Sequence, residues 1–577
     1  MNIKFYYFIN EFDKNEIEKL SAQISLIYRN YNKKNEPEKL KELVMHCKNN
    51  RRKVYISNNL RDAIKYNFDG LYIPSFNKQL GFRNLVKKNL EIIGSAHNVT
   101  ELKIKEKQGC TSIFLSPIFK NNKNKKFLFI KRKVAREIGD FLRTFSIEGL
   151  NYEEEYHRYY PAAETSAHVI GRTNIDGLGS EGIELTQDSL LRGRNGEKLV
   201  LRDRKGDLIR NLDYKSPPNF GKDVRLTIDL NLQFIAYKEL KSAVESHRAR
   251  SGSLVMLDAR SGDILAMLNQ PSYNPNESVP NMEVLRNRAV TDAYEPGSTI
   301  KPFAILAALE TGDFRPDSII DTSPGSYLIS GHKIKDPINY GALSLSEIIQ
   351  FSSNVGISKI AIDLPNRAIY EVLRRSGFGE QVGIGLPGET MGSLRAKDLE
   401  IPVERAALAY GYGLTVTPLQ LANAYLKIAS LGENRRVSIF RSELKPEFDR
   451  IHGEAFTMEV IKMMETVTEI QGTGKAAAVK GYRVAGKTGT AQRFINGRFD
   501  PDSHNVWFVG IVPAYEPRLV MVVVVNDPKA GASGGGTVAA PIFAQVARHS
   551  LRVLGVEPER TMPLASSRIE NRALDQG

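Results

Sequence analysis

Short apolar runs alternate with charged, helix-like stretches over residues 1–127. The runs have the length of buried strands, and each is followed by a polar stretch. They are Ile3–Ile9, Lys53–Ser57, Gly70–Ile73, Glu91–Gly94 and Ser112–Leu115. Strands that alternate with helical stretches are typical of β/α units around a parallel sheet. We therefore predict a β/α segment for residues 1–127.

The pattern changes at the polar, basic run Lys120–Lys126, which we interpret as a linker. Beyond it, residues 128–222 carry a clear hairpin signal, with Leu199–Asp203 and Asp207–Asn211 on either side of a turn that contains Gly206. This predicts a β-rich region over residues 128–222. The stretch Gly177–Gly182 matches Gly-x-Gly-x-x-Gly, but no strand precedes it, so we interpret it as a loop.

From residue 223 the apolar pattern predicts an α/β domain that continues to residue 555. An amphipathic helix over Leu230–Glu245 is followed by a hairpin, Ser253–Asp258 and Asp263–Met267. The longest apolar run, Leu519–Val525, has the length and β-branching of a buried strand. We expect a mixed sheet packed by helices on both faces, and then a polar tail over residues 556–577.

The length of 577 residues indicates several domains. Residues 1–130 hold 25 Lys and Arg against 12 Asp and Glu, whereas the remaining residues hold 55 against 54. The basicity thus belongs to one segment, and we predict no nucleic-acid partner. Two cysteines, Cys47 and Cys110, form neither a disulfide framework nor a metal cluster, so we predict no metal and no cofactor. The sequence shows no apolar run long enough for a transmembrane helix and no signal peptide.

The first candidate chemistry lies in Glu295–Phe303. Apolar residues recur at helical spacing after a Pro-Gly entry, which predicts a helix over Ser298–Glu310. Residues i and i+3 of a helix share a face, so the Lys301 amine can lie over the Ser298 hydroxyl. A desolvated lysine can take the proton of such a serine and make it nucleophilic. The alternative is a capping serine beside a solvated lysine.

Two further motifs follow, Phe351-Ser-Ser-Asn354 and Gly486-Lys-Thr-Gly-Thr-Ala491. The order Ser-x-x-Lys, Ser-x-Asn, Lys-Thr-Gly is the motif set of penicillin-binding proteins and serine β-lactamases. Further family landmarks are Arg158–Pro161, Ala167–Gly171, Glu181–Glu184, Tyr412–Gln420 and Val525–Pro528. Residues 128–577 therefore resemble the division-specific, class B penicillin-binding proteins of Gram-negative bacteria. Ser352 and Asn354 could also be an N-cap pair for a helix over Val355–Ile360.

The resemblance implies a peptidoglycan D,D-transpeptidase of septal wall synthesis that acts through an acyl-enzyme on Ser298. In this mechanism Lys301 is the base, and Ser352 relays a proton to the leaving nitrogen. The expected substrate-binding residues are Asn354, Lys487, Thr488, Gly489 and Thr490. The two threonine hydroxyls would share one face of a strand and meet the substrate carboxylate, and Gly489 would let the substrate backbone approach closely. The oxyanion hole is expected from the backbone N–H groups of Ser298 and Thr490.

The resemblance also implies partners and a location. The substrates are stem peptides, a D-Ala-D-Ala donor and a diaminopimelate-type acceptor, and β-lactams acylate the same serine. Other divisome proteins, including a glycosyltransferase, are expected partners of an inner-membrane protein with a periplasmic catalytic domain. In this family residues 128–222 correspond to the pedestal, or dimerisation-type, domain. The missing anchor is a departure from the family.

The first segment carries a second resemblance. Asp69–Pro74, Ile93–Asn98 and Ile113–Phe119 resemble thiamine-phosphate synthase barrels over the first five or six strands. The phosphate-binding glycine loops expected after the last strands are missing, so His97 and Ser116 would be remnants of a site. We interpret residues 1–127 as an inactive, truncated barrel joined by fusion or by an assembly artefact.

Three alternatives stay open at the level of sequence. A D,D-carboxypeptidase would use water in place of the acceptor amine, and a serine β-lactamase would need a deacylating glutamate, for which we find no matching motif. The pedestal and the Tyr412–Gln420 landmark favour the transpeptidase. A non-catalytic divisome scaffold or a broken fusion would carry the motifs without a working site.

Overall fold

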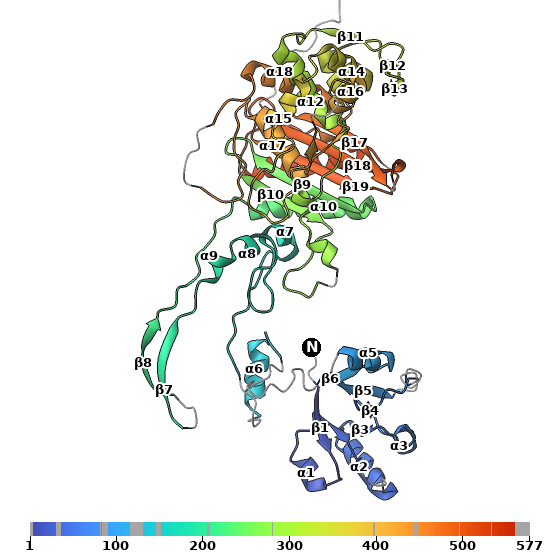
Figure 1. Ribbon diagram of the computed structural model, residues 1–577, viewed down its shortest axis with the longest axis vertical. Helices are drawn as coiled ribbons and strands as arrows, with labels where there is room; N and C mark the ends of the chain where they lie inside the picture. Colours follow the sequence, from blue (N-terminus) through green and yellow to red (C-terminus); the bar gives the residue numbers. More distant parts are fainter. Residues whose placement is uncertain are drawn as a thin grey trace, which may run out of the picture. The chain divides into compact units, whose positions relative to one another are not determined.

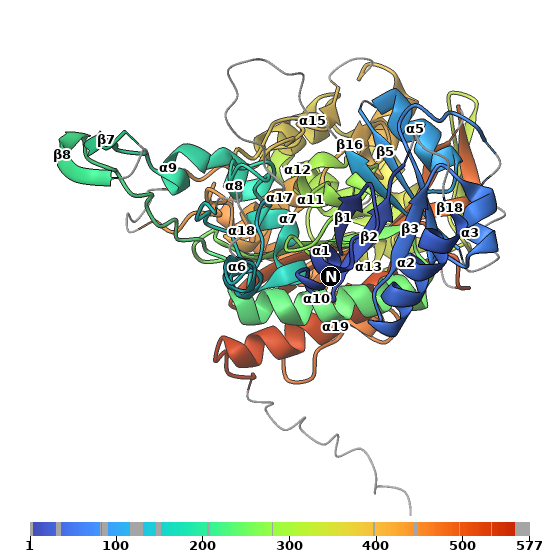
Figure 2. The same ribbon diagram turned by 90° about the horizontal axis from the view of Figure 1, so that it is seen from below.

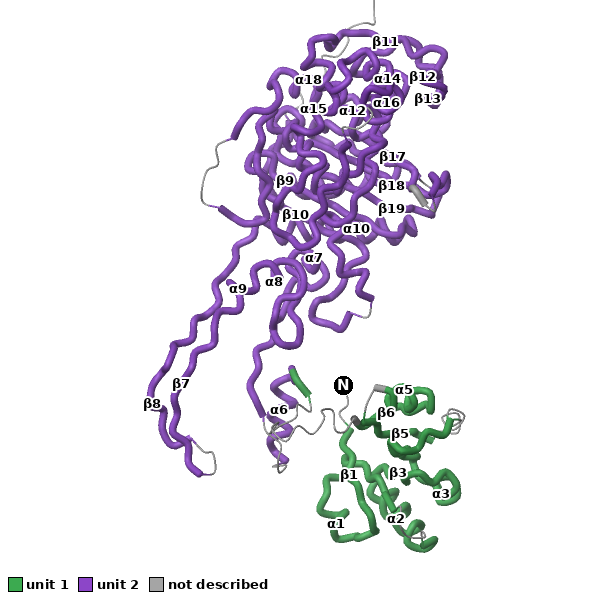
Figure 3. The backbone as a smooth tube through the Cα atoms, viewed as in Figure 1, with its two compact units in different colours: residues 1–132 green, residues 133–577 purple. Residues whose placement is uncertain are grey.

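The computed structural model describes residues 4–30, 36–80, 82, 90–97, 99–115, 131–145, 152–204, 208–279, 281–395, 399–442, 448–495, 497–531 and 533–559. The chain divides into two compact units, Met1–Arg132 and Lys133–Gly577 (Figure 3). Ser116, the linker Lys120–Lys126 and all but the start of the predicted polar tail lie outside the described residues.

The first unit is built on a six-stranded parallel sheet in which every strand pairs with its neighbours in the sequence (Figure 1). Its strands are β1 (Phe5–Ile9), β2 (Ile24–Tyr28), β3 (Val54–Ser57), β4 (Gly70–Ile73), β5 (Glu91–Ala96) and β6 (Ser112–Leu115). The helices between them are α1 (Lys14–Glu18), α2 (Pro37–Asn49), α3 (Leu60–Lys65) and α5 (Val99–Lys107). The predicted parallel β/α segment is confirmed, although β2 was not among the predicted strands.

Aromatic rings fill the side of this sheet that the helices leave uncovered. Phe114 of β6 packs edge-to-face on Tyr6 of β1, with ring centroids 5.2 Å apart, and it also contacts Phe8 and Tyr72. Since β1 and β6 are the two edge strands, the sheet curves until its edges approach one another. His97 lies just after β5, where its ring is 2.8 Å from the Ser75 hydroxyl.

The second unit begins with helical turns and one long hairpin. Its elements before residue 222 are α6 (Arg136–Arg143), η1 (Ala163–Thr165), α7 (Ala167–Ile170), α8 (Gly182–Thr186), α9 (Asp188–Arg192), β7 (Glu197–Arg202) and β8 (Leu208–Ser216). The hairpin β7–β8 is the one predicted, while residues 205–207 of its turn are outside the described residues. The glycine-rich stretch is a loop up to residue 181, and Gly182 begins α8. Arg158 pairs with the buried carboxylate of Glu184, with Nε 2.6 Å from Oε1.

The rest of this unit is organised by a five-stranded sheet in the order β10-β9-β19-β18-β17. The strands are β9 (Ser251–Asp258), β10 (Ile264–Gln270), β17 (Ala485–Ile495), β18 (Arg498–Val512) and β19 (Leu519–Asn526). Neighbouring strands are antiparallel, and an isolated parallel bridge joins Asp263 to Ser438. The predicted hairpin β9–β10 and the buried Val-rich strand β19 are both confirmed.

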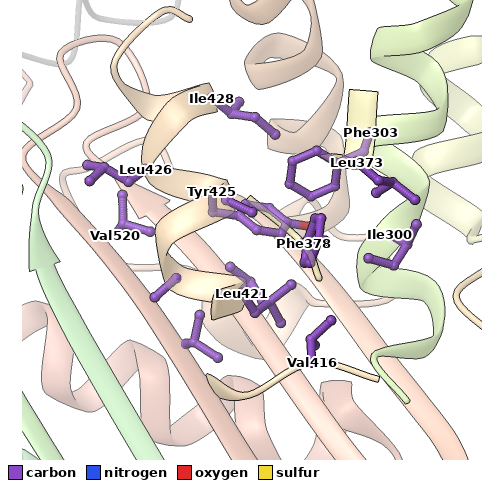
Figure 4. Packing of buried hydrophobic residues seen from close by; sticks show 14 of the residues in the cluster. Ile300, Phe303, Leu373, Phe378, Val416, Leu421, Tyr425, Leu426, Ile428 and Val520 are labelled. Carbon is purple, nitrogen blue, oxygen red and sulfur yellow. The ribbon is translucent and has the colours of Figure 1, made fainter. Parts of the chain in front are cut away.

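Helices cover both faces of this sheet, as predicted. On one face, α10 (Leu230–Ser246) and α19 (Gly535–Val553) lie side by side and bury their apolar stripes against the strands (Figure 2). On the other face, α17 (Pro418–Ala429) packs between the sheet and α12 (Lys301–Thr311). There the ring of Phe303 meets those of Phe378 and Tyr425 edge-to-face, at 5.3 and 5.2 Å (Figure 4). This cluster fixes the start of α12 relative to the sheet.

Shorter elements complete the domain around these layers. They are η2 (Met282–Leu285), α11 (Arg288–Thr291), η3 (Gly297–Ile300), β11 (Ile319–Asp321), β12 (Ser326–Ile329), β13 (His332–Lys335), β14 (Ala342–Ser344), α13 (Leu345–Phe351), α14 (Asn354–Asp363), α15 (Ala368–Arg375), β15 (Ser393–Leu394), α16 (Pro402–Ala409), β16 (Leu414–Thr415), α18 (Glu454–Glu465), η4 (Thr466–Thr468) and η5 (Lys475–Ala477). No helix in the described part of the chain is both long and apolar enough to span a membrane.

Candidate active site

Ser298 and Lys301 lie at the start of α12, but Ser298 is not in the α-helix that the sequence predicts. Residues Gly297–Ile300 form the 3₁₀ turn η3, in which the Lys301 N–H donates to the Ser298 carbonyl, and α12 begins at Lys301. Side chains three residues apart eclipse one another in such a turn, so Ser298 and Lys301 share one side of it. Ser298 is half-buried, whereas Lys301 is fully buried.

The turn is held by the segment that precedes α17. The Gly297 N–H donates to the Gly411 carbonyl at 3.1 Å, and a Cβ on Gly411 would lie 1.9 Å from the Gly297 carbonyl oxygen. Gly411 also has a φ of +90°, so both space and backbone conformation require glycine there. The Tyr425 hydroxyl donates to the Thr299 carbonyl at 2.6 Å. Two independent contacts therefore fix the backbone on either side of Ser298.

The Lys301 amine points at the second motif. Its Nζ donates to the Ser352 carbonyl at 2.5 Å and to Asn354 Oδ1 at 2.8 Å, and it lies 3.2 Å from Ser352 Oγ. Among the described residues the Ser298 hydroxyl makes no side-chain hydrogen bond, which differs from the predicted contact with Lys301. A buried amine needs several acceptors, and the Ser352–Asn354 turn supplies them. Burial, and next the charge of Lys487, lower the pKa of Lys301 well below its ordinary value, while Asp336 opposes this shift.

Ser352 and Asn354 come from the tight turn between α13 and α14. Ser352 is the C-cap that follows α13, with a φ of +59°, and Asn354 is the first residue of α14. The alternative interpretation of these two residues as an N-cap pair was therefore wrong. The N-cap is Ser353, whose Oγ accepts a hydrogen bond from the Gly356 N–H at 2.8 Å. Because the Ser353 side chain caps α14, it is Ser352 and Asn354 that contact Lys301.

Lys487 lies on the edge strand β17 and reaches the same turn from the opposite side. Its Nζ donates to Ser352 Oγ at 2.9 Å and to the Thr488 carbonyl at 3.2 Å. The side chain is completely buried, which lowers the pKa of Lys487 to about 7. One serine hydroxyl is therefore shared by two buried lysines.

The rest of the third motif packs against the start of α19. The Thr490 hydroxyl accepts from the Gly535 N–H at 3.2 Å, and Thr488 Oγ1 bonds to Thr473 Oγ1 at 2.9 Å. A Cβ on Gly536 would contact the Thr488 methyl group at 3.6 Å. Both threonines thus lie toward one helix terminus, as the period-2 rule predicts, and the partial positive charge of that terminus favours a carboxylate.

A close contact between β17 and η3 requires glycine at position 489, a constraint that the sequence did not reveal. A Cβ at this position would lie 2.8 Å from both the Pro296 carbonyl oxygen and the Thr299 methyl group. The glycine therefore lets η3 approach β17 directly. An ideal Cβ on Gly297 would lie 3.2 Å from the Thr490 carbonyl oxygen, so Ser298 and Thr490, the two expected oxyanion donors, sit in adjacent segments.

Sequence reasoning missed Asp336, which follows β13. Its carboxylate accepts hydrogen bonds from Ser353 Oγ, the Asn354 N–H and the Val355 N–H. No motif marks this position, because it precedes the residues that it contacts by 17 to 19 positions along the chain. Within the described residues, no group of three His, Cys, Asp or Glu side chains could hold a metal ion.

The arrangement can activate a serine and receive an acyl group. A buried amine with a lowered pKa lies three residues from a half-buried hydroxyl, and the edge strand β17 borders it. A family model, the penicillin-binding protein transpeptidase domain, matches residues 252–548, and the penicillin-binding protein dimerisation domain matches residues 19–226. The chain belongs to the penicillin-binding protein transpeptidase family. It is accordingly a serine-type transpeptidase, and the predicted resemblance to division-specific class B members is confirmed.

Named relatives agree with this membership. The peptidoglycan D,D-transpeptidase FtsI of Escherichia coli (strain K12) is 40% identical over 447 residues, which cover 77% of this chain and 75% of that protein. The probable peptidoglycan D,D-transpeptidase PenA of Neisseria meningitidis serogroup A is 41% identical over 452 residues, with coverages of 78% and 77%.

A solved structure gives the same result for the catalytic fold. The transpeptidase domain of penicillin-binding protein 3 from Burkholderia pseudomallei superposes with a TM-score of 0.54 at 35% identity, covering 58% of this chain and 98% of that one. None of these matches supports the resemblance of residues 1–127 to thiamine-phosphate synthases, which stays a prediction.

Proposed function

We propose that this protein is a septal peptidoglycan D,D-transpeptidase. Ser298 Oγ attacks the carbonyl carbon of the penultimate D-Ala of a stem peptide, and an ester bond forms as the terminal D-Ala leaves with the proton taken from Ser298. The amine of a diaminopimelate-type residue on a second stem then attacks this ester. The new peptide bond crosslinks the two stems and the serine recovers its proton.

The observation that carries this proposal is the environment of Lys301. Lys301 is completely buried beside a second buried lysine and is hydrogen-bonded to a serine and an asparagine. These surroundings lower its pKa well below the ordinary value of a lysine and so favour its neutral form. It can therefore accept the proton of Ser298. The names of the relatives support the same chemistry, since both are called peptidoglycan D,D-transpeptidases.

The other motif residues take roles that fit their positions. Ser352, between the two lysines, relays the proton to the leaving nitrogen, and Asn354 holds the amide of the donor peptide. Thr488, Thr490 and Lys487 receive its terminal carboxylate beside the positive end of α19. Gly489 keeps β17 against η3, so that the N–H groups of Ser298 and Thr490 form the oxyanion hole. Because a β-lactam resembles D-Ala-D-Ala, it acylates the same serine.

Residues 128–222 serve as the pedestal, residues 223–555 as the transpeptidase domain and residues 556–577 as a tail. By family resemblance the catalytic domain works in the periplasm at the inner membrane. Its partners there are stem peptides and divisome proteins, including a glycosyltransferase.

Covalent labelling with a fluorescent penicillin tests the nucleophile. The full chain should form a stable conjugate that peptide mapping assigns to Ser298, and Ser298→Ala should give none while keeping its circular dichroism spectrum. Incubation with a D-Ala-D-Ala stem peptide and an amine acceptor should release D-Ala and yield the crosslinked peptide. Hydrolysed donor without crosslinked product would identify a D,D-carboxypeptidase, and the absence of labelling in folded protein would overturn the proposal.

A further inference from the structure

Asp527, which directly follows β19, joins β17, β18 and the loop before α19. Its Oδ1 accepts a hydrogen bond from Ser503 Oγ at 2.7 Å and pairs with Lys529 Nζ at 2.6 Å, and its Oδ2 pairs with Arg493 Nη1 at 3.2 Å. Ser503 belongs to β18, Arg493 to β17 and Lys529 to the loop. The Asp527 side chain is only 16% exposed, so one largely buried carboxylate binds the three segments together.

The charge of Asp527 is maintained by these partners. Burial raises the pKa of its carboxyl group, but hydrogen bonds from Lys529 and Ser503 and the charges of Lys529 and Arg493 outweigh burial and lower the pKa overall. Asp527 is therefore a carboxylate at neutral pH, shared by two cations.

The backbone of Asp527 is held as firmly as its side chain. Its φ of +55° lies in the left-handed region, which non-glycine residues adopt rarely and most often as Asn or Asp. The Asp527 N–H donates to the His504 carbonyl at 2.7 Å, and the Lys529 N–H donates to the His247 carbonyl at 2.9 Å. The chain is thus fixed at two consecutive points as it leaves the sheet.

The end of β17 needs such support because its pairing with β18 is interrupted. The register shifts between Gln492 and Arg493, which leaves residues 501–503 of β18 as a bulge. Within this bulge Arg493 Nη1 donates to Ser503 Oγ at 3.1 Å, in addition to its pair with Asp527. Asp527 therefore replaces the lost strand pairing by ionic contacts.

Both segments that Asp527 holds lead to Thr490. Arg493 lies three residues after Thr490 on β17. From Asp527 the chain continues to Gly535, whose N–H donates to the Thr490 hydroxyl at 3.2 Å. A Cβ on Gly535 would lie 2.6 Å from the Gly489 carbonyl oxygen, so the start of α19 approaches β17 closely. A shift of either segment would displace Thr490 relative to the helix terminus.

We propose that Asp527 is a positioning residue of the transpeptidase site. It holds β17 and the segment before α19 in the arrangement that places Thr490 at the start of that helix. This inference rests on the proposed function, in which Thr490 meets the terminal carboxylate of the donor peptide.

Two variants separate the contacts of Asp527 from its backbone conformation. Asn and Gly both tolerate a positive φ, so Asp527→Asn removes the charge and Asp527→Gly removes every side-chain contact without straining the turn. The control is Asp502→Asn, because Asp502 is exposed and its backbone carbonyl accepts the hydrogen bond from Lys529. The measured quantity is the acylation rate constant, per folded protein, for benzylpenicillin and for its methyl ester, which lacks the carboxylate.

We expect the wild type to react faster with the acid than with the ester. Asp527→Gly should lose about 10-fold in rate with the acid and much less with the ester, since displacement of a positioning group by about 1 Å can cost up to about 100-fold. Asp527→Asn should show a smaller loss of the same kind, and Asp502→Asn should match the wild type.

The ratio of the two rates distinguishes positioning from folding. A structural role alone would lower the melting temperature and slow both compounds equally, without changing the ratio. An unchanged ratio in both Asp527 variants, or a wild type that does not distinguish acid from ester, would overturn the inference. A wild type that neither compound acylates would overturn the proposed function instead.

Discussion

Lys301 and Lys487 meet at one atom, the hydroxyl oxygen of Ser352, which lies 3.2 Å from the first Nζ and 2.9 Å from the second. Both lysines are completely buried, so each charge disfavours the other in surroundings of low dielectric constant. Burial and the neighbouring charge of Lys487 thus lower the pKa of Lys301 well below its ordinary value, which favours the neutral form that can act as a base.

Removal of the charge on Lys487 should move the pH dependence of acylation in a defined direction. Lys487 lowers the pKa of Lys301, so Lys487→Gln should raise it, and a higher pH will be needed to make Lys301 neutral. The acid limb of the rate profile should therefore shift to higher pH. The measurement is the penicillin acylation rate against pH, with the exposed Lys480→Gln as control. An unmoved limb would show that Lys487 acts only in substrate binding.

Replacement of the base itself should affect the rate far more than the fold. Lys301→Gln keeps a hydrogen-bonding side chain in the buried site but cannot take the proton of Ser298. General-base catalysis typically contributes about 10²- to 10⁴-fold, so acylation should fall by that range. The measurement is single-turnover labelling beside a thermal melt. A rate within about 3-fold of the wild type in a folded variant would exclude Lys301 as the base.

Gly489→Ala tests the contact between β17 and η3. The new methyl group would meet the Pro296 carbonyl oxygen and the Thr299 methyl group at 2.8 Å, and both belong to packed backbone or a buried side chain. Overpacking of this kind costs about 1–3 kcal/mol and should displace the turn that carries Ser298. Urea denaturation should show the loss of stability, and acylation should slow in parallel.

The matched control is Gly534→Ala, where the added Cβ would meet only Thr537 Oγ1 at an ordinary 3.4 Å. This variant should denature close to the wild-type urea concentration. Equal effects of the two substitutions would mean that the contact with η3 is not what requires glycine at position 489.

Tyr425→Phe removes the hydroxyl that donates a hydrogen bond to the residue after Ser298. The hydroxyl donates to the Thr299 carbonyl at 2.6 Å in a fully buried position, so its loss leaves a buried acceptor without this donor. Stability should decrease by about 1–3 kcal/mol, measured by urea denaturation. The comparison is Tyr515→Phe, because Tyr515 is 46% exposed and removal of its hydroxyl leaves no buried acceptor without a donor. Equal stability of Tyr425→Phe and the wild type would contradict the bracing role of this bond.

The sequence predicted the parts of the site that are encoded locally. Ser-x-x-Lys, Ser-x-Asn and Lys-Thr-Gly are short patterns with a fixed order, and the structure brings Lys301, Ser352, Asn354 and Lys487 within hydrogen-bonding distance. Apolar periodicity likewise predicted α10, the hairpin β9–β10 and the parallel sheet of the first unit. In each case the information lies within one element or between neighbours along the chain.

What could not be predicted depends on contacts between distant segments. Asp336 has no motif, since its partners are two N–H groups of a helix that starts 18 residues later and the hydroxyl of its N-cap, Ser353. The constraint on Gly489 comes from Pro296, nearly 200 residues away in the sequence. The 3₁₀ start of α12 follows from the bond between Gly297 and Gly411 rather than from helix propensity. Such features appear only once tertiary packing is known.

The order of the catalytic sheet determines when this domain can fold. Its central strand β19 pairs with β9, and 260 residues lie between the end of β9 and the start of β19. A ribosome needs about 13 to 52 s to make that stretch. Until then β9 and β10 form only a hairpin, and a two-stranded hairpin has little stability alone. The turn η3, which carries Ser298, is synthesised early, whereas the sheet that supports it is complete only once β19 has been made. The catalytic domain therefore folds after its synthesis is nearly complete.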